Sequence, residues 1–182
     1  NLITIPTAET PLVGMHSDEI IPIEDLPIKY VAFSPCFRRE AGAAGSKDKG
    51  LKRVHQFHKV ELFIICKPED SERLHKETIT YVEQMIKDLF PDLTYRTIEL
   101  PDWDRSPVSN STFDIELLVG KDWLEVSSIS NMGDNQTKPA QIRYRPEKNQ
   151  KPVKLHMING SALALPRLTL ALNEKKNLHY LD

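Results

Sequence analysis

Arginines and carboxylates flank one glycine-rich segment of the chain. Arg38 and Glu40 precede this segment, and Arg53, Phe57 and Glu61 follow it. In an extended strand, residues an even number of positions apart share a face, so each group would project from one side of its strand. Guanidinium groups bind phosphates, carboxylates accept hydrogen bonds from amino groups, and an aromatic ring stacks on a base. The spacing therefore fits a site for a polyanion that carries an aromatic base.

The same residues have a simpler interpretation, a solvated strand face crossed by salt bridges. Charged side chains are common on strands, and exposed ion pairs contribute little to stability. Patterning alone favours this simpler interpretation, so longer motifs are needed to decide between the two.

Hydrophobic periodicity predicts the elements that would hold these residues. Strands are expected over residues 28–33, continuing to Phe37, and over 54–66, as an antiparallel hairpin around the glycine-rich loop. Residues 69–89 carry apolar side chains three and four positions apart, which predicts an amphipathic helix ended by Pro91. Further elements are expected as strands at 1–5, 95–100, 112–119, 123–128, 141–145 and 153–158, and as a helix from near Ser161. This order predicts an α+β domain, an antiparallel β-sheet flanked by helices.

Length and composition narrow the class of protein. The 182 residues suit a single domain, and the net charge of −2 excludes a strongly basic surface over the whole chain. No apolar run approaches the ~20 residues of a membrane-spanning helix, and no signal peptide is visible, so no membrane partner is expected. Cys36 and Cys66 match neither a metal site nor a disulfide framework, which favours a reducing intracellular compartment.

Four blocks of sequence resemble, in order and spacing, the motifs of class II aminoacyl-tRNA synthetases, specifically the seryl-tRNA synthetases. Residues 36–61 resemble motif 2, Pro6-Thr-Ala-Glu9 resembles the Thr-x-Glu loop, residues 113–131 resemble the strand pair that supplies metal ligands, and residues 156–167 resemble motif 3. The resemblance covers nearly the whole chain. It implies one partial class II catalytic domain over residues 1–182, with motif 2 at about 29–65 and motif 3 at about 153–175.

The resemblance also implies an ATP site. Arg38 would bind the α-phosphate of ATP and the serine carboxylate, Glu40 would accept the adenine amino group, and Arg53 would hold the γ-phosphate. Phe57 and Arg167 would lie against opposite faces of adenine, and Arg167 would also reach the γ-phosphate. A planar guanidinium can both stack and donate to phosphate. Arg38 and Arg167 are the predicted catalytic residues.

Three further residues complete the implied ATP site. Glu125 and Ser128 would coordinate Mg²⁺ on the phosphates, because this hard cation prefers oxygen ligands. Val54 belongs to the same ATP-binding set. From the strand pattern alone, Glu125 and Ser128 would more simply be solvated surface.

The implied serine site is formed by Thr7, Glu9, Arg38, Glu61, Asn159 and Ser161. Carboxylates there would pair with the substrate ammonium and accept its hydroxyl proton, and such a site strongly rejects alanine. Simpler structural roles stay open for three of these residues. Glu9 would begin a short helix, Ser161 would cap the last helix, and Asn159-Gly160 would form a turn.

The function implied by the resemblance is that of a serine–tRNA ligase. The serine carboxylate would attack the α-phosphorus of ATP, pyrophosphate would leave, and the seryl group would pass to tRNA(Ser). The expected partners are serine, tRNA(Ser) and a second copy in a homodimer, in the cytoplasm or the mitochondrial matrix. Two alternatives remain: a non-catalytic paralogue that acts as a binding or structural protein, and an enzyme that activates another small amino acid.

The chain departs from the family pattern in three places. Motif 1 and the N-terminal tRNA-binding arm are missing, so a fragment of a longer protein is expected. Residues 102–111 keep Asp104 but lose the expected glycines and basic residue, and residues 131–139 lack the usual Cys-Thr-Asp and paired arginines. We expect both loops to affect placement of the tRNA end, or loop packing, more than ATP binding. The Leu-Pro-Arg form of motif 3 favours a bacterial or organellar origin.

Overall fold

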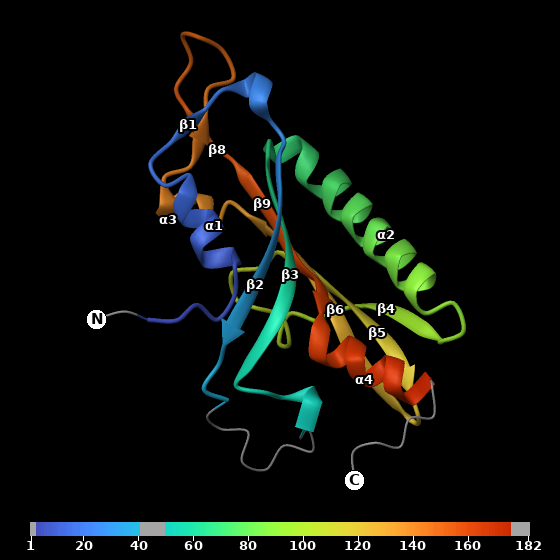
Figure 1. Cartoon of the computed structure of the whole chain (residues 1–182). Coiled ribbons are helices and arrows are strands. Elements are labelled where there is room, and N and C mark those ends of the chain that lie inside the picture. Colours follow the sequence, from blue (N-terminus) through green and yellow to red (C-terminus); the bar gives the residue numbers. More distant parts are fainter. Residues whose placement is uncertain (1–2, 41–49, 176–182) are drawn as a thin grey trace.

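A six-stranded sheet in the order β2-β3-β9-β6-β5-β4 runs through the molecule, and each neighbouring pair of strands is antiparallel (Figure 1). The computed structural model describes residues 3–40 and 50–175. The strands of this sheet are β2 (Ile28–Phe37), β3 (Gln56–Cys66), β9 (His156–Ala164), β6 (Asp122–Gly133), β5 (Ser111–Val119) and β4 (Tyr95–Glu99). The predicted α+β class, with helices flanking an antiparallel sheet, is confirmed.

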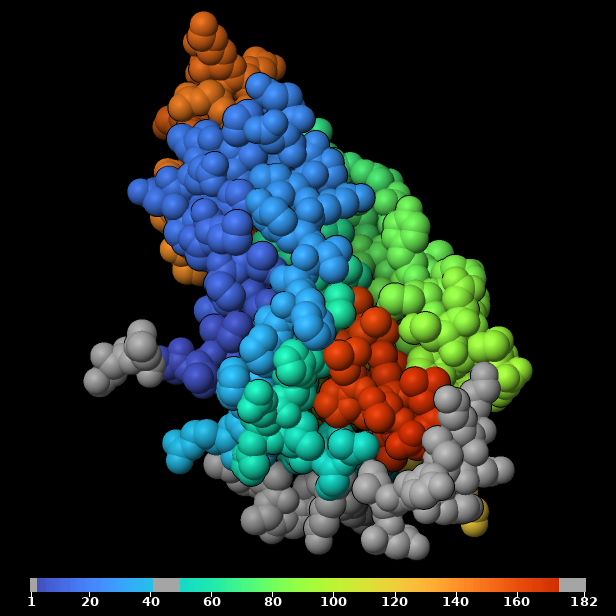
Figure 2. Space-filling model, in the orientation of Figure 1, coloured from blue at the N-terminus to red at the C-terminus, as the bar shows by residue number. Residues whose placement is uncertain are grey.

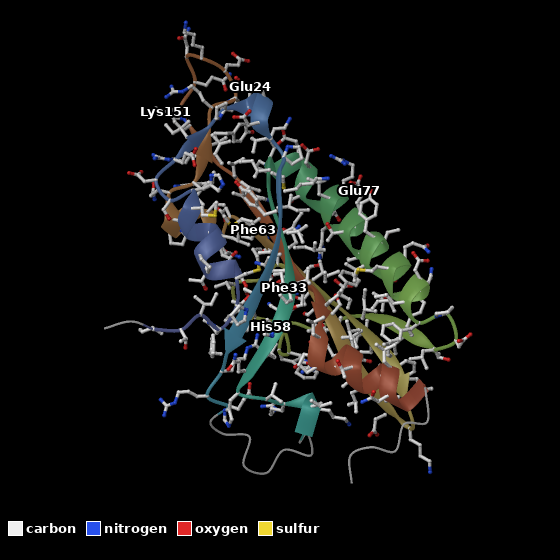
Figure 3. The ribbon with its side chains drawn as sticks, viewed as in Figure 1. Glu24, Phe33, His58, Phe63, Glu77 and Lys151 are labelled. Atoms are coloured by element: carbon white, nitrogen blue, oxygen red, sulfur yellow. The ribbon has the colours of Figure 1, made fainter. Side chains whose placement is uncertain are left out.

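The predicted hairpin is formed by β2 and β3, which pair from Ile28 opposite Ile65 to Phe37 opposite Gln56. On its outer face Phe33 stacks on His58, with ring centroids 5.2 Å apart (Figure 3). β3 begins two residues later than predicted, because the short 3-10 helix η2 (Gly50–Lys52) precedes it. Lys47 and Lys49 of the connecting loop lie outside the described residues.

One face of the sheet is covered by two helices, α2 (Ser71–Leu89) and α4 (Leu165–Lys175) (Figure 1). The predicted long helix is therefore confirmed as α2, which follows the 3-10 turn η3 (Pro68–Asp70). Ile64, Leu74, Val82, Ile129 and Leu168 belong to the apolar core on this face. Complete burial of one such side chain contributes roughly 1.5–3 kcal/mol, so this layer anchors the sheet.

The opposite face is covered at one end only. The elements there are α1 (Glu9–Met15), η1 (Ile23–Asp25), α3 (Thr137–Ala140) and a three-stranded sheet of β1 (Ile20–Ile21), β7 (Arg143–Tyr144) and β8 (Val153–Lys154). Phe63, labelled in Figure 3, lies with Ile65 and Met157 in a second apolar core beneath them. The other end of this face is left for polar side chains.

Three predicted elements differ in the structure. Ile3–Ile5 form no strand, while residues 1–2 of that predicted strand lie outside the described part. Residues 153–158 are divided between β8 and β9, which belong to different sheets. The last helix begins at Leu165 rather than near Ser161, because β9 pairs with β3 on one side through Ala164 and with β6 on the other through Ser161. Pairing with distant strands here overrides the local pattern.

Within the described residues, no helix combines the length and the apolar character needed to cross a membrane.

Candidate active site

A cleft of about 420 Å³ lies where β3, β6 and β9 approach η2 and the first turn of α4. In Figure 2 the residues of η2 and early β3 lie beside the red surface of α4 at one end of the molecule. Nine of the predicted site residues line the cleft: Arg38, Glu40, Arg53, Val54, Phe57, Glu125, Ser128, Ser161 and Arg167. Residues far apart in sequence thus lie around one cavity. The simpler interpretation, a solvated strand face, does not explain this arrangement.

Strand alternation explains only part of how the predicted site residues come to lie around the cleft. Arg38 and Glu40 lie beyond the end of β2, and Arg53 lies before the start of β3, so the expectation that strand faces align them is wrong. Glu40 has a φ of 51°, in the left-handed region, where the chain turns away from the strand. Among the five residues that flank the glycine-rich segment, only Phe57 and Glu61 lie on one strand, where they share a face.

We call the part of the cleft that holds Arg38, Glu40, Arg53, Glu125 and Arg167 the arginine end. Arg53 Nη1 lies 2.9 Å from Glu40 Oε2, and Arg167 Nη1 lies 3.0 Å from Glu125 Oε1 and donates to the Glu125 carbonyl at 2.8 Å. Arg38 donates from Nε to the Pro6 carbonyl at 3.4 Å. Three guanidinium groups therefore surround one cleft, held by contacts that leave them partly exposed.

Phe57 supplies an aromatic surface beside these cations. The guanidinium carbon of Arg38 lies 5.1 Å from the centroid of the Phe57 ring, within cation–π range. A flat ring and several cations in one cleft provide both a stacking surface and an anion site.

A second group of polar side chains, which we call the inner polar cluster, lies deeper along the same sheet face. It comprises Thr7, Glu9, Lys59, Glu61, Gln136 and Asn159. Lys59 Nζ donates to Thr7 Oγ1 at 2.9 Å and forms an ion pair with Glu61 Oε2. Thr7 Oγ1 in turn donates to the same Glu61 oxygen at 3.3 Å. The Lys59 and Glu61 side chains are only 7% and 2% exposed, so this ion pair is buried.

The rest of the cluster is joined through Gln136. Its Nε2 donates to Glu9 Oε1, and its Oε1 accepts from Asn159 Nδ2 at 3.3 Å. Glu9 is the first residue of α1, so the alternative that it begins a short helix is confirmed, and it has a contact within the cluster as well. Of the predicted serine-site residues, Thr7, Glu9, Glu61 and Asn159 thus lie in this cluster rather than at the arginine end.

Burial sets the electrostatics of the cluster. Removal from water raises the pKa of Glu61 above its ordinary value, and the carboxylate of Glu9 acts in the same direction. The ammonium of Lys59 and the hydroxyl of Thr7 act against this shift. The charge of Glu61 therefore depends on the two groups that contact it.

The two alternatives proposed for β9 are wrong. Asn159 and Gly160 lie within the strand and form no turn, and Ser161 cannot cap α4 because the strand continues for three more residues. A β-carbon on Gly160 would lie 2.8 Å from the Ser128 carbonyl oxygen and 2.9 Å from the Ile129 Cα. Glycine therefore permits the close approach of β9 to β6, which sets Ser161 opposite Ser128.

The predicted metal ligands lie together at the edge of the cleft. Glu125 offers a carboxylate and Ser128 a hydroxyl. Within residues 3–40 and 50–175, no group of three or more His, Cys, Asp or Glu side chains is placed to hold a metal ion. Mg²⁺ is commonly held by one or two protein oxygens together with substrate phosphates, so these two ligands fit a metal that binds with a nucleotide.

A further carboxylate, Asp114 on β5, lies opposite Ser128 on β6. Asp114 is 8% exposed, and its Oδ1 is buried without a hydrogen-bond partner in the described structure. Burial raises the pKa of Asp114 to about 6, although a hydrogen bond from Ser128 acts against the shift. Asp114, Glu125 and Ser128 also line a neighbouring cavity of about 430 Å³.

Two members of the inner polar cluster were not predicted from sequence. Lys59 lies between Phe57 and Glu61 on the same strand face, so strand alternation carried a signal for it. Gln136 lies in the stretch 131–139 that departs from the family pattern, and nothing in its sequence context marks it. Gln136 is recognised only through its contacts.

Comparison with known proteins gives a match over most of the chain. Residues 1–176 match the family model described as the tRNA synthetase class II core domain (G, H, P, S and T). The chain is 46% identical to the serine–tRNA ligase of Sorangium cellulosum over 96% of its own length, and it spans 40% of that protein.

Solved structures agree with the sequence match. The crystal structure of seryl-tRNA synthetase from Pyrococcus horikoshii complexed with ATP superposes with a TM-score of 0.89 and 42% identity, over 93% of this chain and 38% of that one. The cytoplasmic serine–tRNA ligase of Naegleria fowleri in complex with AMP gives a TM-score of 0.87 and 31% identity, over 93% and 41% of the two chains. The predicted resemblance to seryl-tRNA synthetases is confirmed.

Proposed function

Because this chain belongs to the tRNA synthetase class II core domain family (G, H, P, S and T), we propose that it is the part of a serine–tRNA ligase that activates serine with ATP. The observation that carries the proposal is the meeting of three arginines and an aromatic ring around one cleft, which Lys59 joins to the buried polar cluster beside it. Relatives named serine–tRNA ligase support the choice of amino acid, and a neighbour complexed with ATP supports the choice of nucleotide. The non-catalytic alternative is not favoured, since the charged side chains predicted to bind ATP all line one cleft.

The arginine end would bind the nucleotide. Adenine would lie between Phe57 and Arg167, with its amino group donating to Glu40. The ion pair of Arg53 with Glu40 is partly exposed, and such pairs contribute at most about 1 kcal/mol. Phosphate oxygens accept stronger, charge-assisted hydrogen bonds, so Arg53 would exchange its carboxylate partner for the γ-phosphate. This exchange would release Glu40 for the base.

Activation requires no covalent nucleophile from the protein. A serine carboxylate oxygen would form a bond to the α-phosphorus, and the bond from that phosphorus to the bridging oxygen of pyrophosphate would break. Arg38 would contact both the carboxylate and the α-phosphate, hold them in line, and stabilise the charge that develops on the phosphate oxygens. Arg167 would hold the leaving pyrophosphate through the γ-phosphate.

Glu125 and Ser128 would hold Mg²⁺ against the phosphates. When bound, this ion neutralises phosphate charge and polarises the phosphoryl oxygens. Glu125 forms an ion pair with Arg167 in this structure. When the nucleotide binds, Glu125 would contact Mg²⁺ and Arg167 would contact the γ-phosphate instead.

The inner polar cluster would receive the amino acid. Glu9 and Glu61 are acceptors for the substrate ammonium and hydroxyl, Thr7 and Asn159 offer neutral polar groups, and Ser161 lines the cleft next to them. A buried acceptor built for a hydroxyl disfavours alanine, because alanine would leave that acceptor unpaired.

The remaining steps are proposed for a longer protein, since the chain spans about 40% of the length of the Sorangium cellulosum relative. They are transfer of the seryl group to tRNA(Ser), pairing in a homodimer, and location in the cytoplasm or mitochondrial matrix.

The test is serine-dependent exchange of labelled pyrophosphate into ATP by the full-length protein with Mg²⁺. We expect exchange with serine, and much less with alanine, glycine or threonine. Absence of exchange with serine would refute the proposal, and stronger exchange with another small amino acid would correct the substrate. Arg38→Ala serves as the inactive reference.

A further inference from the structure

Lys59 contacts two residues of the inner polar cluster, and we propose that it positions Glu61 and Thr7 to bind the hydroxyl-bearing substrate. The inference rests on the proposed activation of serine and names a residue that determines its specificity. Lys59 acts through its neighbours, so it is a positioning residue and takes no part in the bond-forming step.

The backbone makes the placement of Lys59 rigid. Lys59 and Glu61 lie two residues apart on β3, so their side chains leave the same face of the strand. β3 is paired with β2 on one side and with β9 on the other along this stretch. The ammonium therefore comes from a central strand of the sheet and does not depend on the conformation of a loop.

The contacts of Lys59 join two segments that are distant in sequence. Its ammonium donates to Thr7 Oγ1 at 2.9 Å, across 52 positions of the chain, and forms an ion pair with Glu61. Thr7 lies in the segment before α1, where it has no strand partner to hold it. Lys59 thus ties the Thr-x-Glu loop to the sheet at the point where the predicted substrate ligands converge.

Among the residues that the structure describes, the contacts at Glu61 leave one carboxylate oxygen for a ligand. Both the ion pair with Lys59 and the hydrogen bond from Thr7 reach Oε2. Neither contact uses Oε1. Two donors on one oxygen fix the rotation of the carboxylate, so that Oε1 is directed as an acceptor of fixed orientation. A fixed acceptor discriminates between an amino acid with a hydroxyl and one without.

Burial explains why a cation is needed here. The Glu61 side chain is 2% exposed, and a carboxylate at such a depth is stable as an anion only with a compensating charge. The charged groups around Glu61 are Lys59 from the same strand and Glu9 from α1, and the second of these is repulsive. Gln136 and Asn159 are neutral, so within the described cluster the compensation comes from Lys59.

Lys59 also lines the cleft, which brings its influence to the substrate. A lysine that served only to stabilise the fold would affect folding without changing the selection of substrate. A positioning lysine affects the KM for serine and the preference over alanine, and leaves the KM for ATP nearly unchanged.

The test measures pyrophosphate exchange by the full-length enzyme with Lys59→Met, Glu61→Gln and the double variant. We expect Lys59→Met to raise the KM for serine between about 10- and 150-fold, the range for a hydrogen bond to a charged group. The preference for serine over alanine should fall by a similar factor, and the KM for ATP should change less than about threefold. Lys29→Met, which removes an exposed lysine from the neighbouring strand, is the matched control.

The double variant separates positioning from general damage. If Lys59 acts through Glu61, adding Lys59→Met to Glu61→Gln raises the KM for serine little further, so the two effects are not additive. The double variant also lacks the buried Glu61 carboxylate, which Lys59→Met alone would leave without its cation. A folded sample is therefore available even if Lys59→Met alone unfolds. An unchanged KM for serine, equal increases for serine and ATP, or fully additive effects would overturn the inference. Absence of serine exchange by the unmodified enzyme would instead refute the proposed function, and this inference with it.

Discussion

The arginine end and the inner polar cluster both contain ion pairs between a basic and an acidic side chain, but these pairs differ in their exposure to solvent. At the arginine end, Arg53 and Glu40 are 40% and 19% exposed, and Arg167 and Glu125 are 28% and 43% exposed. In the inner polar cluster, the side chain of Glu61 is 2% exposed. The ion pairs of the arginine end are therefore open to solvent, whereas the ion pair of the inner polar cluster is buried.

This difference matches what each end would have to do. Exposed ion pairs are weak and are readily exchanged for a ligand, which suits a nucleotide whose phosphates arrive with their own charges. A buried ion pair is costly to break, and it holds its acceptors in one orientation. On the proposed function, the nucleotide would organise the arginine end when it binds, whereas the inner polar cluster is organised before the amino acid arrives.

The largest expected effect is the loss of a buried partner. Glu61→Leu would leave the ammonium of Lys59 buried without its anion, so we expect the free energy of unfolding to fall by about 3–5 kcal/mol. Glu40→Leu, at the exposed ion pair, should lower it by less than about 1 kcal/mol. Urea unfolding measures both. Equal losses at the two sites would abolish the distinction between the ends of the cleft.

The next effect concerns catalysis at the exposed end. Arg38→Ala should lower kcat for serine-dependent exchange by about 100- to 1000-fold, because a group that stabilises transition-state charge is removed. Its effect on stability should be small, since Arg38 is exposed. Arg39→Ala, the adjacent exposed arginine outside the cleft, should change kcat less than about threefold. Comparable losses in both variants would show that general positive charge, and not Arg38, is required.

A third prediction concerns the strand contact between the two ends. In Gly160→Ala, the new β-carbon would meet backbone atoms of β6 at 2.8–2.9 Å, so the strands must separate. We expect a loss of about 1–3 kcal/mol in the free energy of unfolding, with reduced exchange activity. Gly14→Ala in α1 meets nothing within 4 Å and should stabilise the protein by up to about 1 kcal/mol. A neutral Gly160→Ala would contradict the close approach of Ser161 to Ser128.

The smallest effect comes from a buried polar group on the other face of the sheet. His75 lies 3% exposed behind β6 and contacts the Ile129 carbonyl oxygen at 3.1 Å. Burial lowers the pKa of His75 below its ordinary value of 6.5. The neutral ring therefore contributes stability above about pH 6.5, and this contribution is lost as the pH falls through the lowered pKa, at no more than about 1.4 kcal/mol per pH unit.

Urea unfolding between pH 7 and pH 5 checks this prediction. On acidification, His75→Gln should lose less stability than the unmodified protein, because the ring that must take up a proton is gone. An identical change of stability with pH in His75→Gln would mean that other groups cause the pH dependence.

The parts of the fold predicted correctly are those with local periodicity. Alternation across 28–37 and 54–66 indicated the hairpin, and the spacing of apolar residues across 69–89 indicated α2. The errors fall where a segment is defined by distant partners. β9 continues through Ser161 because β3 and β6 pair with it there, and Ile3–Ile5 lack a strand in the described structure although their side chains are apolar.

The candidate site follows the same division. The motifs identified Arg38, Glu40, Arg53 and Arg167, because their residue types and spacing form a long and specific pattern. Their roles toward ATP and serine stay predictions until the variants are measured. Gln136 was missed because a single amide side chain, in a stretch that departs from the family pattern, carries no such signal.

The sequence by itself determined which chemical groups are present and how they repeat along each element, since side-chain type and strand or helix period are local properties. It also determined the family, through motifs in order. Only the tertiary structure decided which groups meet. Lys59 reaches Thr7 across 52 positions and Gln136 reaches Glu9 across 127, and these contacts join the inner polar cluster, while the arginine end stays open to solvent. Burial strengthens the interaction between charges because it lowers the effective dielectric constant, and burial arises only when distant segments pack together.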